Sequence, residues 1–182
     1  MYQPAYQIQQ TACGQTDRAA PLTVLVIDDD PAYRYLCVCA LQEATDADYV
    51  TIEAGSAGEA LEQMRSHRVD CALVDYRLPD ATGADLIDMI RTEIPDWLGS
   101  IIVMTSGGSE EVAAEILRAG ASDYIPKQQV SPQCLRRAIH NATEKASLYR
   151  AIRRRSLQVS EANEKLQQRN REITQFYHRV SH

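Results

Sequence analysis

The chain has 182 residues, of which 45% are hydrophobic and 24% are charged, and its formal net charge is −6. This length suits one ordinary globular domain with an extension. No apolar run approaches the roughly 18 residues of a membrane span, and the first residues lack the basic and apolar regions of a signal peptide. The composition therefore argues against both kinds of segment in this sequence.

The cysteines indicate a reducing environment. There are five of them, an odd number, and no two show the Cys-x-x-Cys spacing of zinc sites and redox motifs. A disulfide framework is not expected, so a cytoplasmic protein fits best. Residues 1–20 are rich in glutamine and show little periodicity, and we expect them to be disordered.

The charge is distributed unevenly and predicts a boundary near residue 130. Residues 1–130 contain 8 Lys and Arg against 21 Asp and Glu, a net charge of −13, while residues 131–182 contain 11 against 4, a net charge of +7. A basic tail raises the possibility of nucleic-acid binding. However, glutamates are interspersed with the basic residues and only Arg153 to Arg155 form a run, so we favour a solvated helix face and expect no nucleic-acid partner.

Short apolar runs alternate with helical patterns through the first part of the chain. The predicted strands are residues 22–27, 49–54, 69–74, 100–105 and 121–126, and the predicted helices are residues 31–44, 56–67, 83–94 and 109–119. This alternation predicts an α/β fold with a doubly wound parallel sheet covered by helices on both faces. In such sheets the binding site lies beyond the carboxyl ends of the strands.

Polar residues follow these predicted strands. The first strand is followed by Asp28, Asp29 and Asp30, the third by Asp75, and the fifth by Lys127, and the fourth ends at Thr105. Carboxylates that converge at one sheet edge repel each other unless a cation lies between them, and hard oxygen ligands favour Mg²⁺. With an adjacent ammonium and hydroxyl, this set suits attack of a carboxylate oxygen on a phosphoryl group.

Each of these residues also has an ordinary structural interpretation. Asp30 before Pro31 is a typical helix start, so we interpret Asp30 as an N-cap. Taken singly, Asp75, Thr105 and Lys127 would be a strand-end, a turn and a surface residue. The functional interpretation rests on their occurrence at successive strand ends.

The segments VLVIDDDPAYR, LVDYRLPDATG, IIVMTS and AGASDYIPK resemble the receiver domain of two-component response regulators, over residues 21–145. The resemblance implies a flavodoxin-like fold with five strands in the order 2-1-3-4-5. It also implies that Asp75 is the phosphoacceptor and that an upstream histidine kinase or phosphotransfer protein is the phosphodonor. The family pattern assigns the remaining roles by position. Mg²⁺ would be held by Asp28, Asp29, Asp75 and the backbone carbonyl of Arg77. Thr105 would bond the transferred phosphoryl group, Lys127 would pair with that group, and Tyr124 would change rotamer on switching. One departure is Gln128, where many receivers have a proline.

A long helix is predicted from Ser131-Pro132 onward. Apolar residues recur every seven positions at Ile152, Val159, Leu166, Ile173 and Val180, and Asn163 and Asn170 occupy companion positions. This pattern predicts a parallel homodimeric coiled coil over residues 146–174, with the asparagines fixing its register. The alternative is an amphipathic helix that packs on its own receiver.

The final segment FYHRVSH, within residues 175–182, resembles the start of the phosphoacceptor helix of sensor histidine kinases. The resemblance implies that His182 is the phosphoacceptor histidine of a hybrid kinase parent. The sequence has no glycine-rich nucleotide loop, so we expect no ATP binding by this segment. The alternatives are a free-standing response regulator whose helical tail binds a partner protein and a receiver whose basic helix binds nucleic acid. A metal pair formed by His178 and His182 is less favoured, because no carboxylate or thiol neighbours it.

Overall fold

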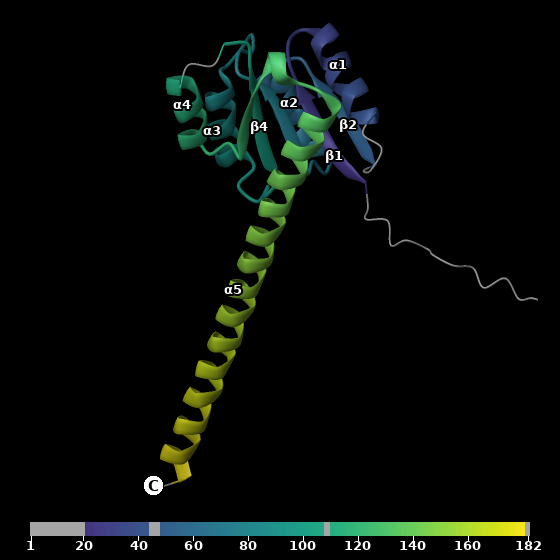
Figure 1. Cartoon of the computed structure of the whole chain (residues 1–182). Coiled ribbons are helices and arrows are strands. Elements are labelled where there is room, and N and C mark those ends of the chain that lie inside the picture. Colours follow the sequence, from purple (N-terminus) through teal and green to yellow (C-terminus); the bar gives the residue numbers. More distant parts are fainter. Residues whose placement is uncertain (1–20, 44–47, 108–109, 181–182) are drawn as a thin grey trace, which may run out of the picture.

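The computed structural model describes residues 21–43, 48–107 and 110–180. A five-stranded parallel sheet lies at its centre, with strand order β2-β1-β3-β4-β5, so the predicted flavodoxin-like order is confirmed. The strands are β1 (Leu22–Ile27), β2 (Tyr49–Ala54), β3 (Cys71–Asp75), β4 (Ser100–Thr105) and β5 (Asp123–Pro126). The helices are α1 (Pro31–Gln42), α2 (Ala57–Ser66), α3 (Gly83–Glu93), α4 (Glu110–Ala119) and α5 (Pro132–Val180), with a short 3₁₀ turn η1 (Lys127–Gln129) before α5 (Figure 1).

Two layers of apolar side chains cover the sheet, one on each face. Leu25, Val74 and Val103 contribute to the cluster that α2, α3 and α4 cover. The alternate residues of the same strands, among them Val24 and Leu73, contribute to the cluster under α1 and α5. Because both faces are buried, β1 and β4 contain continuous apolar runs, residues 24–27 and 101–104, as central strands of a parallel sheet do.

The observed elements agree closely with the predicted ones, with one informative difference at β5. That strand begins at Asp123 rather than at residue 121, because the amide hydrogens of Gly120 and Ala121 both donate to the carbonyl of Ile116 at the end of α4. Gly120 has a φ of 103°, a conformation that favours glycine. The helix terminus thus includes Ala121, which the apolar pattern assigned to the strand, whereas the amide of Ser122 already donates to Ile101 of β4.

The start of α1 confirms the structural role predicted for Asp30. Its side chain accepts a hydrogen bond of 2.9 Å from the amide of Ala32, and Pro31 occupies the first helical position. Asp30 therefore caps α1, which begins directly above the acidic residues that follow β1.

Helix α5 contains 49 residues and is about 70 Å long at 1.5 Å per residue. Its first turns pack on the sheet through Leu135 and Ile139, which are fully buried. Contact with the rest of the domain continues past the predicted boundary at residue 145, since Arg150 lies 3.9 Å from Asp70 and Arg153 lies 3.9 Å from Asp96. Residues 151–171 are exposed, and Figure 1 shows the helix continuing well beyond the sheet. Beyond Arg153, residues 154–171 of α5 therefore do not pack on their own receiver.

Some predictions fall on residues that are not described. The N-terminal residues 1–20, predicted to be disordered, and His182 lie outside the described ranges. Within the described ranges, no helix combines the length and apolarity needed to cross a membrane.

Candidate functional site

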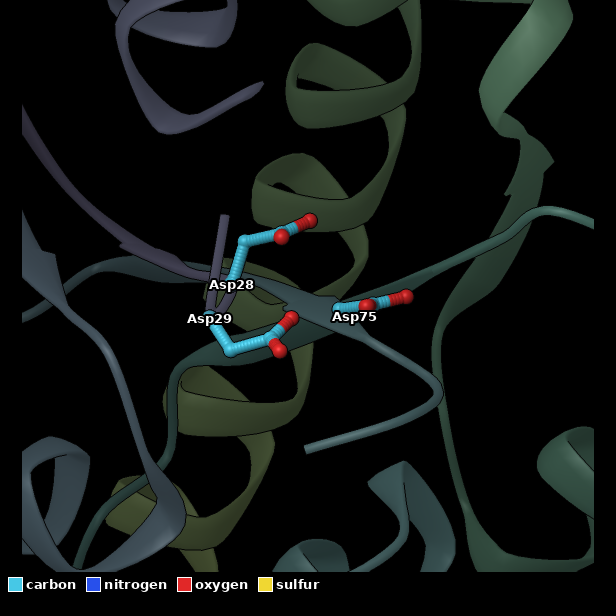
Figure 2. Close-up of side chains that lie close together, drawn as sticks. All are labelled: Asp28, Asp29 and Asp75. Atoms are coloured by element: carbon cyan, nitrogen blue, oxygen red, sulfur yellow. The ribbon is translucent and has the colours of Figure 1, made fainter. Parts of the chain in front are cut away.

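Three aspartates converge at the carboxyl edge of the sheet. Asp28 directly follows β1 and Asp75 ends β3, and these two strands are hydrogen-bonded neighbours. Each of Asp28, Asp29 and Asp75 offers a carboxylate oxygen, and these oxygens lie within 4.8 Å of one another (Figure 2). Asp28 and Asp75 are buried, whereas Asp29 is exposed. The predicted acidic cluster is thus present, with its open side at Asp29.

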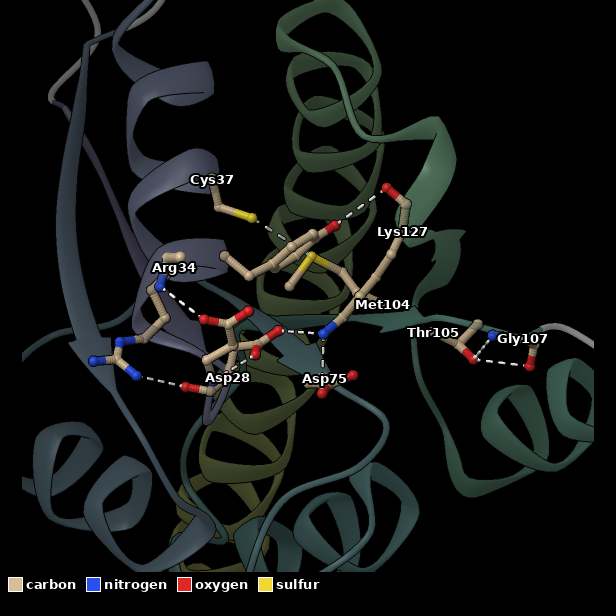
Figure 3. Close-up of polar contacts among 11 residues, drawn as sticks. Asp28, Arg34, Cys37, Asp75, Met104, Thr105, Gly107 and Lys127 are labelled. Carbon is tan, nitrogen blue, oxygen red and sulfur yellow. Dashed lines mark hydrogen bonds and ion pairs between the residues drawn. The ribbon is translucent and has the colours of Figure 1, made fainter.

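Lys127 supplies the positive charge of this site. Its Nζ lies 2.6 Å from Oδ2 of Asp28 and 3.0 Å from Oδ2 of Asp75, so one ammonium joins two buried carboxylates (Figure 3). Burial alone would lower the pKa of Lys127, but the two carboxylates outweigh it and hold the pKa above its usual value. Lys127 is therefore charged throughout the neutral range.

The pKa of Asp75 is raised. Burial is the main cause and the charge of Asp28 adds to it, while the hydrogen bonds from Lys127 and from the amide of Arg77 oppose it. Asp75 thus has a carboxylate that is poorly solvated and held in place by donors. Such a carboxylate is placed to act as a nucleophile.

Asp28 is fixed by contacts on every side. Its Oδ1 accepts a bond of 3.0 Å from the amide of Asp30, and its backbone carbonyl accepts a bond of 2.8 Å from Nη1 of Arg34. Arg34 in turn pairs with Glu53 of β2 at 3.0 Å. The Asp30 amide and Lys127 compensate the burial of the Asp28 carboxylate, while Arg34 fixes the position of the Asp28 backbone.

Thr105 lies at the end of β4, as predicted, and its hydroxyl bonds within its own loop. Its Oγ1 donates to the carbonyl of Gly107 at 3.0 Å and accepts from the amide of Gly107 at 3.3 Å (Figure 3). The adjacent carbonyl of Ser106 accepts a bond of 2.7 Å from Nε2 of Gln128. A contact between Thr105 and a group on Asp75 would require this hydroxyl to leave Gly107.

The remaining predicted residues flank this centre. Tyr124 is half-buried in β5, where it packs against the cluster that α2, α3 and α4 cover. Arg77 lies two residues beyond Asp75 in the loop before α3. The same loop is held by Asp80, whose carboxylate accepts bonds of 2.9 and 3.0 Å from the amides of Ala57 and Gly58. These bonds lower the pKa of Asp80.

Several contacts at the site were not predicted. Arg34 and Asp80 orient the loops that contain Asp28 and Asp75, and Tyr33 contacts Lys127. Gln128 was noted only as a departure from the family pattern. Tyr33 and Arg34 lie close in sequence to Asp28 and Asp29, and this is the one signal that could have indicated them. No sequence pattern shows that Arg34 contacts a residue of β2 or that Tyr33 contacts a residue of η1.

The donor set fits a divalent cation of the Mg²⁺ type. The cluster has three carboxylates, and Lys127 is the cation that pairs with two of them. The three negative charges therefore exceed the single positive charge of this lysine. The candidate ligands are all oxygens, and the exposed Asp29 leaves one side open for water molecules, which Mg²⁺ usually keeps.

Together, the doubly wound sheet and an acidic cluster with a lysine at its carboxyl edge define a signal receiver domain. The family model described as the response regulator receiver domain matches residues 24–140, and the chain belongs to this family. The family is that of two-component signalling, so the predicted receiver domain is confirmed.

Two curated relatives match just over half of this chain. The chain is 37% identical over 93 residues to the regulatory protein LuxO of Vibrio cholerae, a match that covers 51% of this chain and 20% of LuxO. It is 35% identical over 104 residues to the DNA-binding transcriptional activator DevR/DosR of Mycobacterium tuberculosis, covering 57% of this chain and 46% of that protein. The chain therefore spans about a fifth of the length of LuxO and just under half of the length of DevR/DosR.

Solved structures agree on the fold. A response regulator receiver domain protein (CheY-like) from Methanospirillum hungatei JF-1 superimposes with a TM-score of 0.62 at 27% identity, covering 71% of this chain and 99% of the other. A putative response regulator from Chloroflexus aurantiacus J-10-fl gives a TM-score of 0.62 at 28% identity, covering 69% and 99%.

Proposed function

We propose that Asp75 is the phosphoacceptor of a phosphorelay and that the phosphorylated receiver signals through α5. The observation that supports this most directly is the position of the Lys127 ammonium between Asp28 and Asp75, beside the open, acidic side of the site at Asp29. An ammonium at this position can pair with the phosphoryl group once it is bound to Asp75.

The chemistry is a phosphoryl transfer between two carboxylates when acetyl phosphate is the donor. An oxygen of Asp75 attacks phosphorus, the bond from phosphorus to the acetyl oxygen breaks, and acetate leaves with the electron pair. The product is an acyl phosphate on Asp75, and no net proton is consumed. Lys127 neutralises charge that the phosphoryl oxygens bring into the site, and Thr105 can donate its hydroxyl to one of them after leaving Gly107.

Asp28, Asp29, Asp75 and the backbone carbonyl of Arg77 would hold Mg²⁺, which would supply charge neutralisation for the phosphoryl oxygens. The carboxylates fit this role because their oxygens converge within 4.8 Å. The role of the Arg77 carbonyl rests on its position in the family pattern.

Intact-mass measurement after incubation with Mg²⁺ and acetyl phosphate tests the assignment. We expect the wild-type chain to gain one phosphoryl group and an Asp75→Asn variant to gain none. Asp88→Asn, an exposed aspartate of α3, is the matched control and should be modified like wild type. Equal modification of Asp75→Asn and wild type would show that the acceptor lies elsewhere.

We further propose that α5 forms a parallel homodimeric coiled coil over residues 146–174. The described seam residues Ile152, Val159, Leu166 and Ile173 are between 53% and 59% exposed in the single chain, so they are available to a second copy. Burying each of these apolar side chains contributes roughly 1.5–3 kcal/mol, and parallel pairing lets Asn163 and Asn170 each meet their own copies.

Paired leucine variants test the seam by sedimentation equilibrium. Leu166 occupies the seam, whereas Leu157, which is equally exposed at 59%, lies on the opposite side of α5. We expect Leu166→Ser to weaken the dimer at least tenfold and Leu157→Ser to leave it unchanged. Crosslinking of a cysteine at Asn163, in a background without native cysteines, reports parallel register. A monomeric wild-type chain, or equal effects of the two serines, would contradict this interface.

The output of the receiver is proposed to be a histidine kinase module that includes His182 of this chain as its phosphoacceptor. The resemblance of FYHRVSH to the start of a kinase phosphoacceptor helix supports this, as does the direction of α5 away from the receiver. The next codons of the parent gene test it, with Glu-Leu-Arg-Thr-Pro expected. A different continuation would favour a regulator whose helical tail binds a partner protein, and binding of labelled DNA by the chain would favour the nucleic-acid alternative.

A further inference from the structure

We propose that Tyr33 is a positioning residue that holds Lys127 in the receiver site. It is the first-turn tyrosine of α1, and it contacts Lys127 at two separate points. Its hydroxyl donates to the backbone carbonyl of Lys127 at 3.3 Å, and its ring centroid lies 4.3 Å from Nζ of the same lysine. The inference rests on the proposed role of Asp75 and adds a residue to that site.

The two contacts restrain opposite ends of a long side chain. Lys127 belongs to η1, a short turn of three residues, and its four-carbon stem can adopt many rotamers. Tyr33 fixes the backbone end through the hydroxyl and the ammonium end through the ring. The lysine then loses less rotational freedom when it pairs with the carboxylates, because its path is already defined.

The ring also supplies the face of the ammonium that the carboxylates leave uncovered. Asp28 and Asp75 accept from Nζ at 2.6 and 3.0 Å, and only 14% of the lysine side chain is exposed. A buried ammonium needs a favourable environment in every direction that water has left. The negative face of an aromatic ring provides one, and such a cation–π contact is stronger when it is desolvated.

Tyr33 itself is suited to this role. It is half-buried, and burial raises the pKa of its phenol, so the hydroxyl remains a neutral donor at physiological pH. A leucine at this position would keep the apolar cover of the site and lose the ring. A phenylalanine would keep the ring and lose only the hydroxyl.

The test compares three variants with wild type. Tyr33→Leu removes the ring, Tyr33→Phe retains it, and Tyr35→Leu is the matched control on the same helix, where Tyr35 is 70% exposed. The first readout is the rate of phosphorylation by acetyl phosphate in Mg²⁺, measured by mass and corrected for the folded fraction. We expect Tyr33→Leu to be about 5- to 30-fold slower, Tyr33→Phe to stay within about threefold of wild type, and Tyr35→Leu to match wild type.

A second readout needs neither metal nor phosphodonor. Because Nζ of Lys127 lies 4.3 Å from the ring centroid, we expect the protons on the adjacent carbon to show an upfield ring-current shift in the NMR spectrum. We expect this shift to persist in Tyr33→Phe and to disappear in Tyr33→Leu. A tyrosine whose ring does not lie over the Lys127 ammonium would not produce this shift.

The outcomes separate the inference from the proposed function. If the wild-type chain is not phosphorylated on Asp75, the proposed function fails, while the NMR shift still reports whether Tyr33 orients Lys127. If wild type and Tyr33→Leu react at equal rates, or Tyr33→Phe is as slow as Tyr33→Leu, the ring does not position the lysine for the reaction. Absence of the ring-current shift in wild type would overturn the contact itself.

Discussion

Replacement of Lys127 by methionine should destabilise the folded chain when no divalent cation is present. Methionine has nearly the same length as lysine but no charge, so the change removes the shared partner of Asp28 and Asp75. The two carboxylates are buried and then face each other without compensation. Asp29 adds a third negative charge at the same edge.

Two considerations give the same magnitude. The carboxylate oxygens lie within 4.8 Å of one another, and unit charges at that limit repel by about 3.5 kcal/mol at an effective dielectric constant of about 20. Removing one member of a buried ion pair typically costs about 3–5 kcal/mol. Because Asp75 can relieve part of the repulsion by taking up a proton, we expect a loss near the lower limit, about 3 kcal/mol, and a fall of about 10 °C in Tm.

The assay is thermal and urea unfolding in EDTA and in Mg²⁺, followed by circular dichroism. Lys165→Met is the matched control, since Lys165 is exposed on α5, and it should change stability by less than about 0.5 kcal/mol. In Mg²⁺ the difference between Lys127→Met and wild type should narrow, because the cation compensates the carboxylates that the lysine has left.

The pH dependence has a defined sign. Loss of Lys127 removes the main effect that opposes the raised pKa of Asp75, so that pKa rises further above its unfolded value of about 3.9. A carboxyl group with a raised folded pKa binds more protons in the folded state, so its stability contribution is lost as pH rises through the folded pKa. The deficit of the variant should therefore be small near pH 4 and largest at neutral pH. A Lys127→Met protein as stable as wild type in EDTA at neutral pH would refute the reasoning.

Three further predictions concern the fold. Ile139→Ala should reduce the free energy of unfolding by about 2–5 kcal/mol in urea titrations, because Ile139 of α5 is fully buried against the sheet. A loss below about 1 kcal/mol would mean that α5 does not pack on the sheet as described. Asp30→Ala should reduce the free energy of unfolding by about 1 kcal/mol, because the α1 cap is lost, while Asp75 is still phosphorylated. Abolished phosphorylation would place Asp30 among the reacting groups. Gly120→Ala should reduce the free energy of unfolding by about 1–3 kcal/mol in the same assay, since φ is 103° at this residue and a Cβ atom would collide with the guanidinium of Arg91. An unchanged urea midpoint would argue against this backbone conformation.

The sequence alone predicted the sheet, its helices and the acidic cluster, and the physical reason is local. Strands buried on both faces contain continuous apolar runs, as β1 and β4 do, and helix starts such as Asp30-Pro31 have short-range signals. Because neighbouring parallel strands end at one edge, residues at the carboxyl ends of β1 and β3 must approach each other. The convergence of Asp28 with Asp75 therefore followed from element order without knowledge of any side-chain rotamer.

The tertiary structure decided which side chains meet within that edge. Tyr33 and Lys127 are 94 residues apart, and their contact depends on how α1 and η1 are placed over the end of the sheet. The Thr105 hydroxyl donates to the carbonyl of Gly107, and Arg150 of α5 approaches Asp70, beyond the predicted end of the receiver at residue 145. Such contacts depend on rotamer choice and packing between distant elements, and no periodicity records them. Residue types and strand order thus determine where the site lies, whereas the packing of α1, η1 and α5 determines how its lysine and hydroxyl are oriented.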